Sequence, residues 1–251
     1  MIDNDRYIFL LGGHDLEMVE IRKILESNEL VFFDDDLSWG AKLSSYAKQF
    51  NNSSIFVGIE LIKDVPLPEK YIEIDHHNEK AHLPSSLEQV AGLLGIELNH
   101  WQQLVAANDK GYIPALMALS ATPHEIKQIR SADRKAQGAT DADEKLADSS
   151  ILNHMKKYND LIIIEALTSK FSIICDKLYP FGKLLIYTED ELVYYGAGVE
   201  EVSNKFKNEY DNNIFYSGGG DDGFWGIGRG MLPKEDILKI VKNIKDSFRN
   251  N

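Results

Sequence analysis

The segment YIEIDHHNE, residues 71–79, decides how this sequence folds and where its chemistry lies. An apolar run that leads straight into an acid and two histidines is typical of a buried strand that ends at the edge of a sheet. Histidine is the commonest protein metal ligand and titrates near neutral pH. Asp75, His76 and His77 are therefore predicted to be functional, the alternative being a polar loop or helix cap with solvated histidines.

Three earlier apolar runs are also expected to be strands, at residues 7–13, 29–36 and 54–62. The intervening residues 17–25 and 39–50 have the spacing of amphipathic helices. Strands that alternate with helices imply a mainly parallel sheet with helices on both faces. In such sheets ligands bind at the carboxyl ends of the strands, which is where the segment 75–77 is expected.

The sequence beyond residue 85 changes character twice. Residues 85–157 have helical spacing, and the remainder contains short apolar runs, among them 161–167 and 171–179, which are predicted to be strands of a small α+β domain. A closing amphipathic helix follows. The predicted class is thus α/β with a second, smaller α+β domain, divided into a domain at 1–130, a helical connector at 131–158 and a domain at 159–251.

The composition limits the partners of the protein. Its 27 basic and 40 acidic residues give a formal net charge of −13, which disfavours a groove for long duplex nucleic acid but allows a site for a short nucleotide. The single cysteine, Cys175, excludes an internal disulfide and fits a reducing compartment. No run approaches the roughly 20 apolar residues of a membrane span, and the start lacks the basic residues of a signal peptide. We therefore expect a soluble cytoplasmic protein without membrane partners.

The first predicted strand also ends in polar residues, within GGHDLE at 12–17. Asp15 and Glu17 would point the same way if the loop is extended, with His14 beside them. The alternative is that they are acids in the first turn of a helix, where they complement the helix dipole.

Two further acids are candidates. Glu60 lies in the apolar run VGIEL at 57–61, where a charged residue is rarely buried without a partner, and Asp64 competes with it for the same role. Asp109, in AANDKGY at 106–112, is expected at the end of a helix, where a simple C-terminal cap is the alternative.

Together these residues form a set of oxygen and nitrogen donors without thiols: His14, Asp15, Glu17, Glu60, His76 and Asp109. Such a set suits Mn²⁺ or Mg²⁺ rather than structural zinc. Two such ions about 3.5–4 Å apart can activate a water and stabilise the leaving oxygen in phosphoryl transfer. The sequence therefore predicts a centre with two divalent ions.

The ordered set GGHDLE, VGIEL, IDHHN and AANDKGY resembles the four motifs of the DHH phosphoesterase superfamily. That superfamily includes manganese-dependent pyrophosphatases, exopolyphosphatases, single-strand exonucleases and hydrolases of short oligonucleotides and cyclic dinucleotides. The resemblance spans residues 6–112 through the motifs and, more loosely, the whole chain through its two-domain layout.

The resemblance implies a role for each ligand. Asp15 and Glu17 would each hold one metal ion, and Glu60 would bridge the two ions. His76 would bind the second ion together with Asp109.

The third motif implies two further roles. Asp75 would orient the site, and His77 would face the phosphate and assist the leaving group. The family usually has aspartate where Glu17 and Glu60 stand, and its first-motif histidine usually precedes the acids by several residues, whereas His14 is adjacent. The spacing of the ions is therefore the point at which this chain is expected to differ.

The small domain contains YSGGGDDGFWGIGRG, which is similar to the glycine-rich substrate loop of the DHH-associated domain. The candidate substrate-binding residues are Gly218, Gly219, Gly220 and Arg229. Backbone N–H groups of the glycines can bind an anion, although Asp221 and Asp222 follow where the family usually has a histidine. The alternative is a tight turn between strands, with a small domain that serves folding or dimerisation.

A further basic pair, Arg130 and Arg134, is predicted to share one helix face. A solvated face is the expected arrangement, and contact with substrate is the alternative.

These observations predict a two-metal phosphoesterase that acts on a small phosphate-containing substrate. A phosphodiester such as a short single-stranded oligonucleotide or a cyclic dinucleotide is the first expectation, and a phosphoanhydride such as pyrophosphate or polyphosphate is the second. A protein that binds nucleotide or metal without catalysis is the alternative from another class, and a homodimer stays open.

Overall fold

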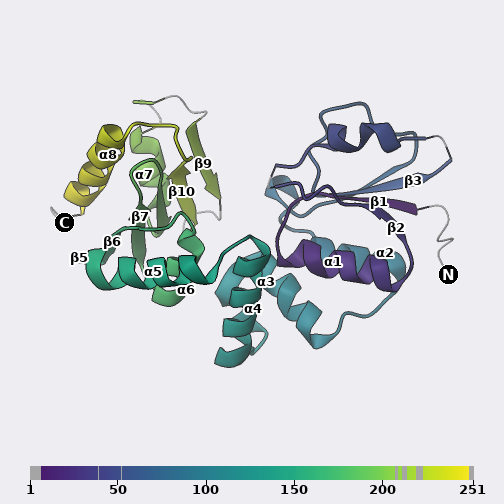
Figure 1. The fold of residues 1–251 in the computed structure, drawn as a ribbon, viewed down its shortest axis with the longest axis horizontal. Helices are drawn as coiled ribbons and strands as arrows, with labels where there is room; N and C mark the ends of the chain where they lie inside the picture. Colours follow the sequence, from purple (N-terminus) through teal and green to yellow (C-terminus); the bar gives the residue numbers. More distant parts are fainter. Residues whose placement is uncertain are drawn as a thin grey trace. The chain divides into compact units, whose positions relative to one another are not determined.

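The computed structural model describes residues 7–38, 40–51, 53–206, 209–210, 214–218 and 223–248 (Figure 1). The chain forms two compact units, Met1–Gly138 and Ala139–Asn251. Their junction falls inside the predicted connector 131–158, so that segment is shared between the units rather than forming a part of its own. The predicted limits 1–130 and 159–251 therefore differ from the division in the structure.

The first unit contains a parallel sheet with the strand order β2-β1-β3-β4. Its strands are β1 (Tyr7–Leu11), β2 (Val31–Phe33), β3 (Ile55–Ile59) and β4 (Tyr71–Ile74). All four lie where apolar runs predict them, and all four end at the same edge because they run in the same direction. The expected α/β class with a parallel sheet is confirmed.

Helices cover this sheet, and capping residues mark where several of them begin. They are α1 (Leu16–Ser27), α2 (Ser86–Leu94), α3 (His100–Ala118) and α4 (Pro123–Ala136), together with the 3₁₀ segments η1 (Leu43–Gln49) and η2 (Asn78–Lys80). Asp15 caps α1, and Ser85, Asn99 and Thr122 each form a capping box at the start of the next three helices. Such caps satisfy amide groups that the first helical turn leaves unpaired.

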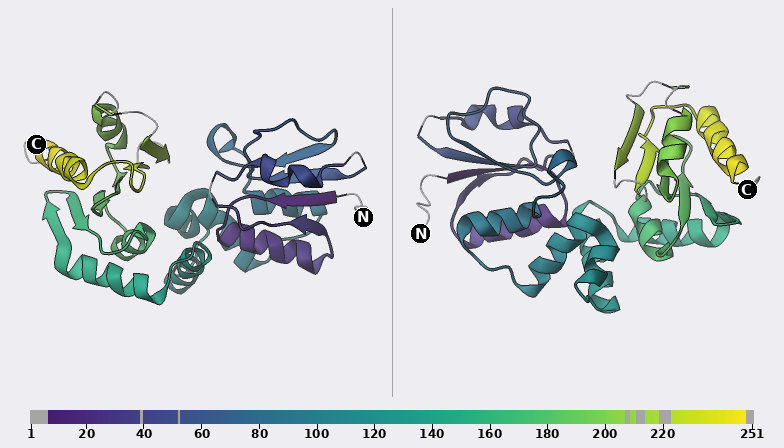
Figure 2. Two further views of the ribbon diagram at one scale, coloured as in Figure 1. Left: turned by 45° about the horizontal axis from the view of Figure 1, so that its top comes forward. Right: turned by 180° about the vertical axis from the view of Figure 1, so that it is seen from behind.

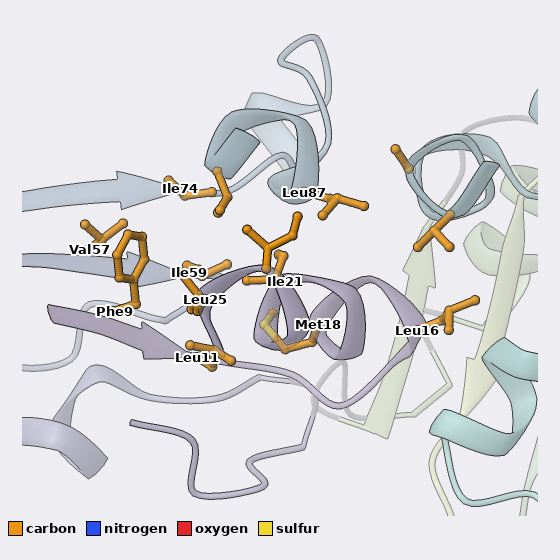
Figure 3. Close-up of a cluster of buried hydrophobic side chains, with 14 of the residues drawn as sticks. Phe9, Leu11, Leu16, Met18, Ile21, Leu25, Val57, Ile59, Ile74 and Leu87 are labelled. Carbon is orange, nitrogen blue, oxygen red and sulfur yellow. The ribbon is translucent and has the colours of Figure 1, made fainter. Parts of the chain in front are cut away.

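The main core lies between one face of the sheet and helices α1 to α4. Figure 3 shows Phe9, Val57 and Ile74 of the strands in one cluster with Ile21 and Leu25 of α1. Each of these buried side chains contributes on the order of 1.5–3 kcal/mol by leaving water. A smaller cluster fills the opposite face beneath η1. The strand ends are thus fixed by packing on both sides.

The second unit is a mixed sheet with the order β5-β6-β7-β8-β10-β9 in the part of the chain that the structure describes. Its strands are β5 (Met155–Tyr158), β6 (Leu161–Glu165), β7 (Lys183–Tyr187), β8 (Leu192–Gly196), β9 (Phe215–Gly218) and β10 (Phe224–Ile227). Only β6 and β7 pair in parallel among these described strands. The expectation of a second, smaller unit that combines strands and helices is confirmed.

Helices pack on both faces of this second sheet (Figure 2). They are α5 (Asp141–His154), α6 (Phe171–Leu178), α7 (Val199–Phe206) and α8 (Lys234–Ser247). Apolar side chains of α7 and α8 share one core with the sheet, and those of α5 and α6 share the other. Among the described residues, no helix has both the length and the apolar character needed to cross a membrane.

Two segments of this unit differ from their predicted structure. Residues 171–179, predicted to be a strand, form α6, because Phe171, Ile174 and Cys175 lie on one helical face that packs into the core. A short apolar run does not distinguish a buried strand from a buried helix by its periodicity. Conversely, β5 continues directly from α5 and pairs with β6 where helix was expected.

Candidate metal centre

Four side chains converge where the strands of the first unit end. Glu17 comes from the first turn of α1, Glu60 follows β3, His76 follows β4 and Asp109 comes from α3. One donor atom of each lies within 4.8 Å of the others. The His76 Nε2 atom is 3.5 Å from Glu17 Oε2, 3.5 Å from Glu60 Oε1 and 2.6 Å from Asp109 Oδ2.

The donor atoms at the centre of this cluster lack hydrogen bonds. Glu17 Oε2, His76 Nε2 and Asp109 Oδ2 are buried, and none of them has a partner of acceptable hydrogen-bond geometry. Buried polar atoms that make no well-formed hydrogen bond cost roughly 1–3 kcal/mol each. Three such atoms aimed at one point, drawn from carboxylates and an imidazole, fit a divalent cation that prefers oxygen and nitrogen donors.

The amino end of α2 holds two of the carboxylates in place. The Leu87 amide donates to Glu17 Oε1 at 3.0 Å, and the Ser86 hydroxyl donates to Glu60 Oε1 at 2.8 Å. Glu17 is only 2% exposed, so this contact fixes its free oxygen toward the cluster. Sequence reasoning missed Ser86 and Leu87, because helical spacing gives no sign that the start of α2 contacts acids on other elements.

The backbone around Glu60 has an uncommon conformation. Glu60 has φ +53°, in the left-handed region, and its amide donates to the Ile74 carbonyl at 2.9 Å. A Cβ atom on Gly12 would lie 2.7 Å from the carbonyl oxygens of both Ile59 and Glu60, so only glycine fits there. Uncommon backbone conformations persist where the surroundings impose them, often at functional sites.

The crowded acids shift the pKa values of the cluster. Burial lowers the pKa of His76, but contacts with Asp109, Glu17 and Glu60 outweigh it and raise the pKa to about 12. Burial, followed by the charge of Asp109, raises the pKa of Glu17 well above its usual value. Burial and the charges of Asp109 and Glu60 raise the pKa of Asp15 to about 7. Without a cation the cluster therefore retains protons that a bound cation would displace.

The remaining first-motif residues lie beside the cluster rather than in it. Asp15 accepts a hydrogen bond from the Met18 amide at 2.9 Å as the cap of α1. His14 is exposed, and its Nδ1 atom lies 3.6 Å from Asp36 Oδ1. Asp64, the competitor of Glu60, is exposed and accepts hydrogen bonds from Ser44. The structure thus brings together Glu60 and not Asp64, and it leaves His14 outside the four-donor cluster.

Asp75 and His77 form a pair next to the cluster. His77 Nδ1 and the His77 amide each lie 3.0 Å from Asp75 Oδ1, and Lys80 donates to Asp75 Oδ2 at 3.2 Å. Burial raises the pKa of Asp75, but the contacts with His77 and Lys80 outweigh it and lower the pKa below its usual value. Since an ionised carboxylate can only accept, Nδ1 of His77 carries the proton and Nε2 is left for another partner.

His77 also lies close enough to the acids for a second role. Its ring centroid is 4.4 Å from that of His76, and a ring nitrogen of His77 belongs to a second group of donors with Glu60 and His76. The geometry therefore allows His77 either to bind a cation or to transfer a proton.

The candidate substrate loop is described only in part. Gly218 ends β9, whereas Gly219, Gly220, Asp221 and Asp222 lie outside the described residues. The Arg229 side chain is exposed, and its Nε atom donates to Asp190 Oδ2 at 3.1 Å. Gly218 and Arg229 line different hollows of the second unit.

The expected solvated face at Arg130 and Arg134 is wrong. Both side chains are buried between α4 and its neighbours, with exposed fractions of 7% and 9%. Helical spacing showed that the two residues share a face, but it did not show that this face packs against neighbouring elements, where Arg130 meets Asn108 and Tyr112 of α3.

The fold has counterparts among solved structures, although no family model matches the sequence and the search of curated proteins found no relative. A pGpG-specific phosphodiesterase from Vibrio cholerae is similar over 98% of this chain and 99% of its own, with 15% identity and a TM-score of 0.53. The DHH domain of a member of a family of ribosomal proteins is similar over 96% of this chain and 87% of its own, with 9% identity and a TM-score of 0.51. Both are DHH-domain proteins, and the likeness covers both units. The chain therefore has the fold of the DHH phosphoesterase superfamily, as its four motifs predict.

Proposed function

We propose that this protein is a divalent-metal-dependent phosphoesterase that hydrolyses a small phosphodiester. The observation that carries the proposal is the cluster of Glu17, Glu60, His76 and Asp109, whose donor atoms lie within 4.8 Å of one another. A site of buried carboxylates and an imidazole at the binding edge of a parallel sheet is suited to a catalytic cation.

The four residues of the cluster would hold Mn²⁺ or Mg²⁺. A divalent ion there would polarise a phosphate oxygen and lower the pKa of a water molecule. The chain itself supplies the orientation, because the amino end of α2 holds both glutamates. The Leu87 amide binds Glu17 Oε1, so Glu17 Oε2 stays directed at the cation. The Ser86 hydroxyl fixes Glu60 Oε1, the same oxygen that faces His76. The second ion stays a prediction, with Asp15 its proposed additional ligand. His14 would have to leave Asp36 to contribute.

His77 is the proposed proton donor to the leaving group. Asp75 holds its Nδ1–H, so Nε2 can carry a proton to a departing alkoxide and take it back from water. Lys80 keeps Asp75 ionised and in place. This division assigns proton transfer to His77 and cation binding to His76.

A short oligonucleotide such as a dinucleotide is the proposed substrate. The likeness to a pGpG-specific phosphodiesterase over nearly the full length of both chains supports it. The net charge of −13 supports a short substrate, because neutralising a long phosphate backbone requires a basic surface.

The test is hydrolysis of pGpG, a cyclic dinucleotide, pyrophosphate and polyphosphate at increasing Mn²⁺ concentration. We expect Mn²⁺-dependent release of nucleotide from the first or second substrate. Turnover of the anhydrides alone would replace the proposed substrate class, and tight Mn²⁺ binding without any turnover would assign the protein to regulation instead of catalysis. Anomalous scattering from a Mn²⁺-soaked crystal would count the ions.

His77→Ala should lower kcat about 10²- to 10⁴-fold, the usual contribution of a general acid or base. Its Mn²⁺ affinity should stay within a few-fold of that of the unchanged protein, because the four-donor cluster is intact. Calorimetry and steady-state kinetics measure the two effects separately. A parallel loss of Mn²⁺ affinity would make His77 a ligand.

Arg229→Ala should raise KM and leave kcat unchanged if Arg229, with glycines 218–220, contacts the substrate phosphate as proposed. Arg229 must then exchange Asp190 for that phosphate. A KM equal to that of the unchanged protein would show that Arg229 does not contact the substrate and only pairs with Asp190.

A further inference from the structure

A second buried polar cluster lies behind the candidate metal centre. It consists of Asn108, Arg130 and Asp133, with exposed fractions of 7%, 7% and 6%. Arg130 Nη1 donates to Asn108 Oδ1 at 2.8 Å and to Asp133 Oδ2 at 2.8 Å. We propose that Arg130 is a positioning residue that fixes the Asp109 carboxylate for the cation, an inference that rests on the proposed function.

Arg130 contacts α3 on both sides of Asp109. Asn108 precedes Asp109 directly, and the Arg130 Cζ atom lies 4.5 Å from the centre of the Tyr112 ring. At the second contact α3 departs from helical geometry: Gly111 and Tyr112 are non-helical, and Tyr112 has φ +57° and ψ −148°. A non-glycine residue in this conformation needs support from its surroundings. The stacked and hydrogen-bonded guanidinium supplies that support where Asp109 must be held.

The other end of the cluster reaches α1. Asp133 Oδ1 lies 3.5 Å from the amide of Leu16, a long hydrogen bond, and accepts a second one from Gln137 Nε2 at 3.1 Å. Leu16 stands between Asp15 and Glu17 in the first turn of α1. One guanidinium therefore links, through Asp133, the segment that carries Glu17 to the segment that carries Asp109.

A contribution to the stability of the fold does not by itself explain why these polar residues are buried. Removing an arginine and a carboxylate from water costs several kcal/mol, and apolar residues of similar volume often stabilise a core as well or better. Arginine offers what an apolar residue does not, a planar group that bonds two oxygens and stacks on an aromatic ring at once. Such outer contacts to ligand-bearing segments typically change metal affinity 10- to 100-fold.

The experiment compares Arg130→Met with Lys135→Met, which removes the same charge from an exposed position on the same helix. We expect Arg130→Met to weaken Mn²⁺ binding in calorimetry about 10- to 100-fold and to speed hydrogen exchange of the amides of residues 108–113 in the metal-free protein. Arg130→Lys should give an intermediate loss, because an ammonium keeps the charge but not the planar stacked group. Lys135→Met should change neither quantity more than two-fold.

Several results would overturn the proposal. An Arg130→Met protein with a lower melting temperature but unchanged Mn²⁺ affinity would reduce Arg130 to a structural role, and equal effects of Lys135→Met would indicate a general loss of charge. If Arg130→Met does not fold, Asn108→Ala removes one contact of the guanidinium and should weaken Mn²⁺ binding in the same direction; unchanged binding would refute the inference.

Failure of the proposed function gives a different pattern. Absence of Mn²⁺ binding by the unchanged protein would reject the metal centre, while hydrogen exchange at 108–113 would still decide whether Arg130 holds this segment. Unchanged exchange in Arg130→Met would reject the positioning role by itself.

Discussion

His76→Ala should abolish both Mn²⁺ binding and hydrolysis, with a loss of turnover of roughly 10³-fold or more, since a catalytic cation supplies several kcal/mol of transition-state stabilisation. His76 contacts all three acids of the cluster and is 6% exposed. No other described imidazole is within reach of Glu17 and Asp109 together, so the lost donor has no substitute. Calorimetry with Mn²⁺ and kinetics at saturating Mn²⁺ measure the two losses.

His77→Ala is the matched control, because it removes the adjacent ring while the cluster stays complete. Circular dichroism must show that the His76→Ala protein folds, since the change leaves three acids without their nearest cation. Glu17→Gln, which keeps the shape of the side chain, should also lose Mn²⁺ affinity. Normal turnover of His76→Ala at saturating Mn²⁺ would remove His76 from the site.

The second large effect is a reversal of the pH dependence of stability by Mn²⁺. In the metal-free protein the pKa of Asp15 is raised from 3.8 to about 7, so its stabilising contribution is complete below pH 3.8 and is lost as the pH rises through 7. The pKa of His76 is raised from 6.5 to about 12, so its contribution is complete below pH 6.5 and falls above it. Both groups make the metal-free protein less stable as the pH rises.

The size of the effect is measurable. A shift of about three pKa units at Asp15 corresponds to roughly 4 kcal/mol of unfolding free energy at most. A cation displaces the protons, so Mn²⁺ should bind more tightly at higher pH. Mn²⁺ at 100 times its Kd should add about 2.7 kcal/mol, which raises the melting temperature by roughly 5–10 °C in a protein of this size.

Thermal unfolding at pH 5, 7 and 8.5, with and without Mn²⁺, tests this expectation. Asp15→Asn should flatten the pH dependence of the metal-free protein between pH 4 and 7, because it removes the group that titrates there. An equal stabilisation by Mn²⁺ at pH 5 and pH 8.5 would show that the cation does not compete with these protons.

The parallel sheet and the convergence of Glu17, Glu60, His76 and Asp109 were predictable because they follow from local patterns. Glu17, Glu60 and His76 each stand next to an apolar run, and parallel strands end at the same edge. Asp109 lies on α3, and the order of the four motifs indicated its place at the site. His14 was misleading for the same reason: it follows β1 as closely as its neighbours do, yet the structure directs it to Asp36. A residue that follows a strand in the sequence can be placed at the edge of the sheet. The direction in which its side chain points depends on the conformation of the loop.

The supporting contacts could not be predicted in this way. Ser86 and Leu87 contact acids on distant elements, and Arg130 joins two helices through partners that lie 22 and three residues away. A helical period of 3.6 residues does not distinguish an arginine that faces solvent from one that packs against a neighbouring helix. Such contacts depend on how whole helices pack.

The contacts of α2 with Glu17 and Glu60 limit which side-chain length this site accepts. The DHH pattern usually has aspartate at both positions, and aspartate is one methylene shorter. The two glutamates reach the Leu87 amide and the Ser86 hydroxyl and still present an oxygen to the cluster. Side-chain length and helix placement are therefore coupled: aspartate at either position would keep both contacts only if α2 lay closer to the sheet.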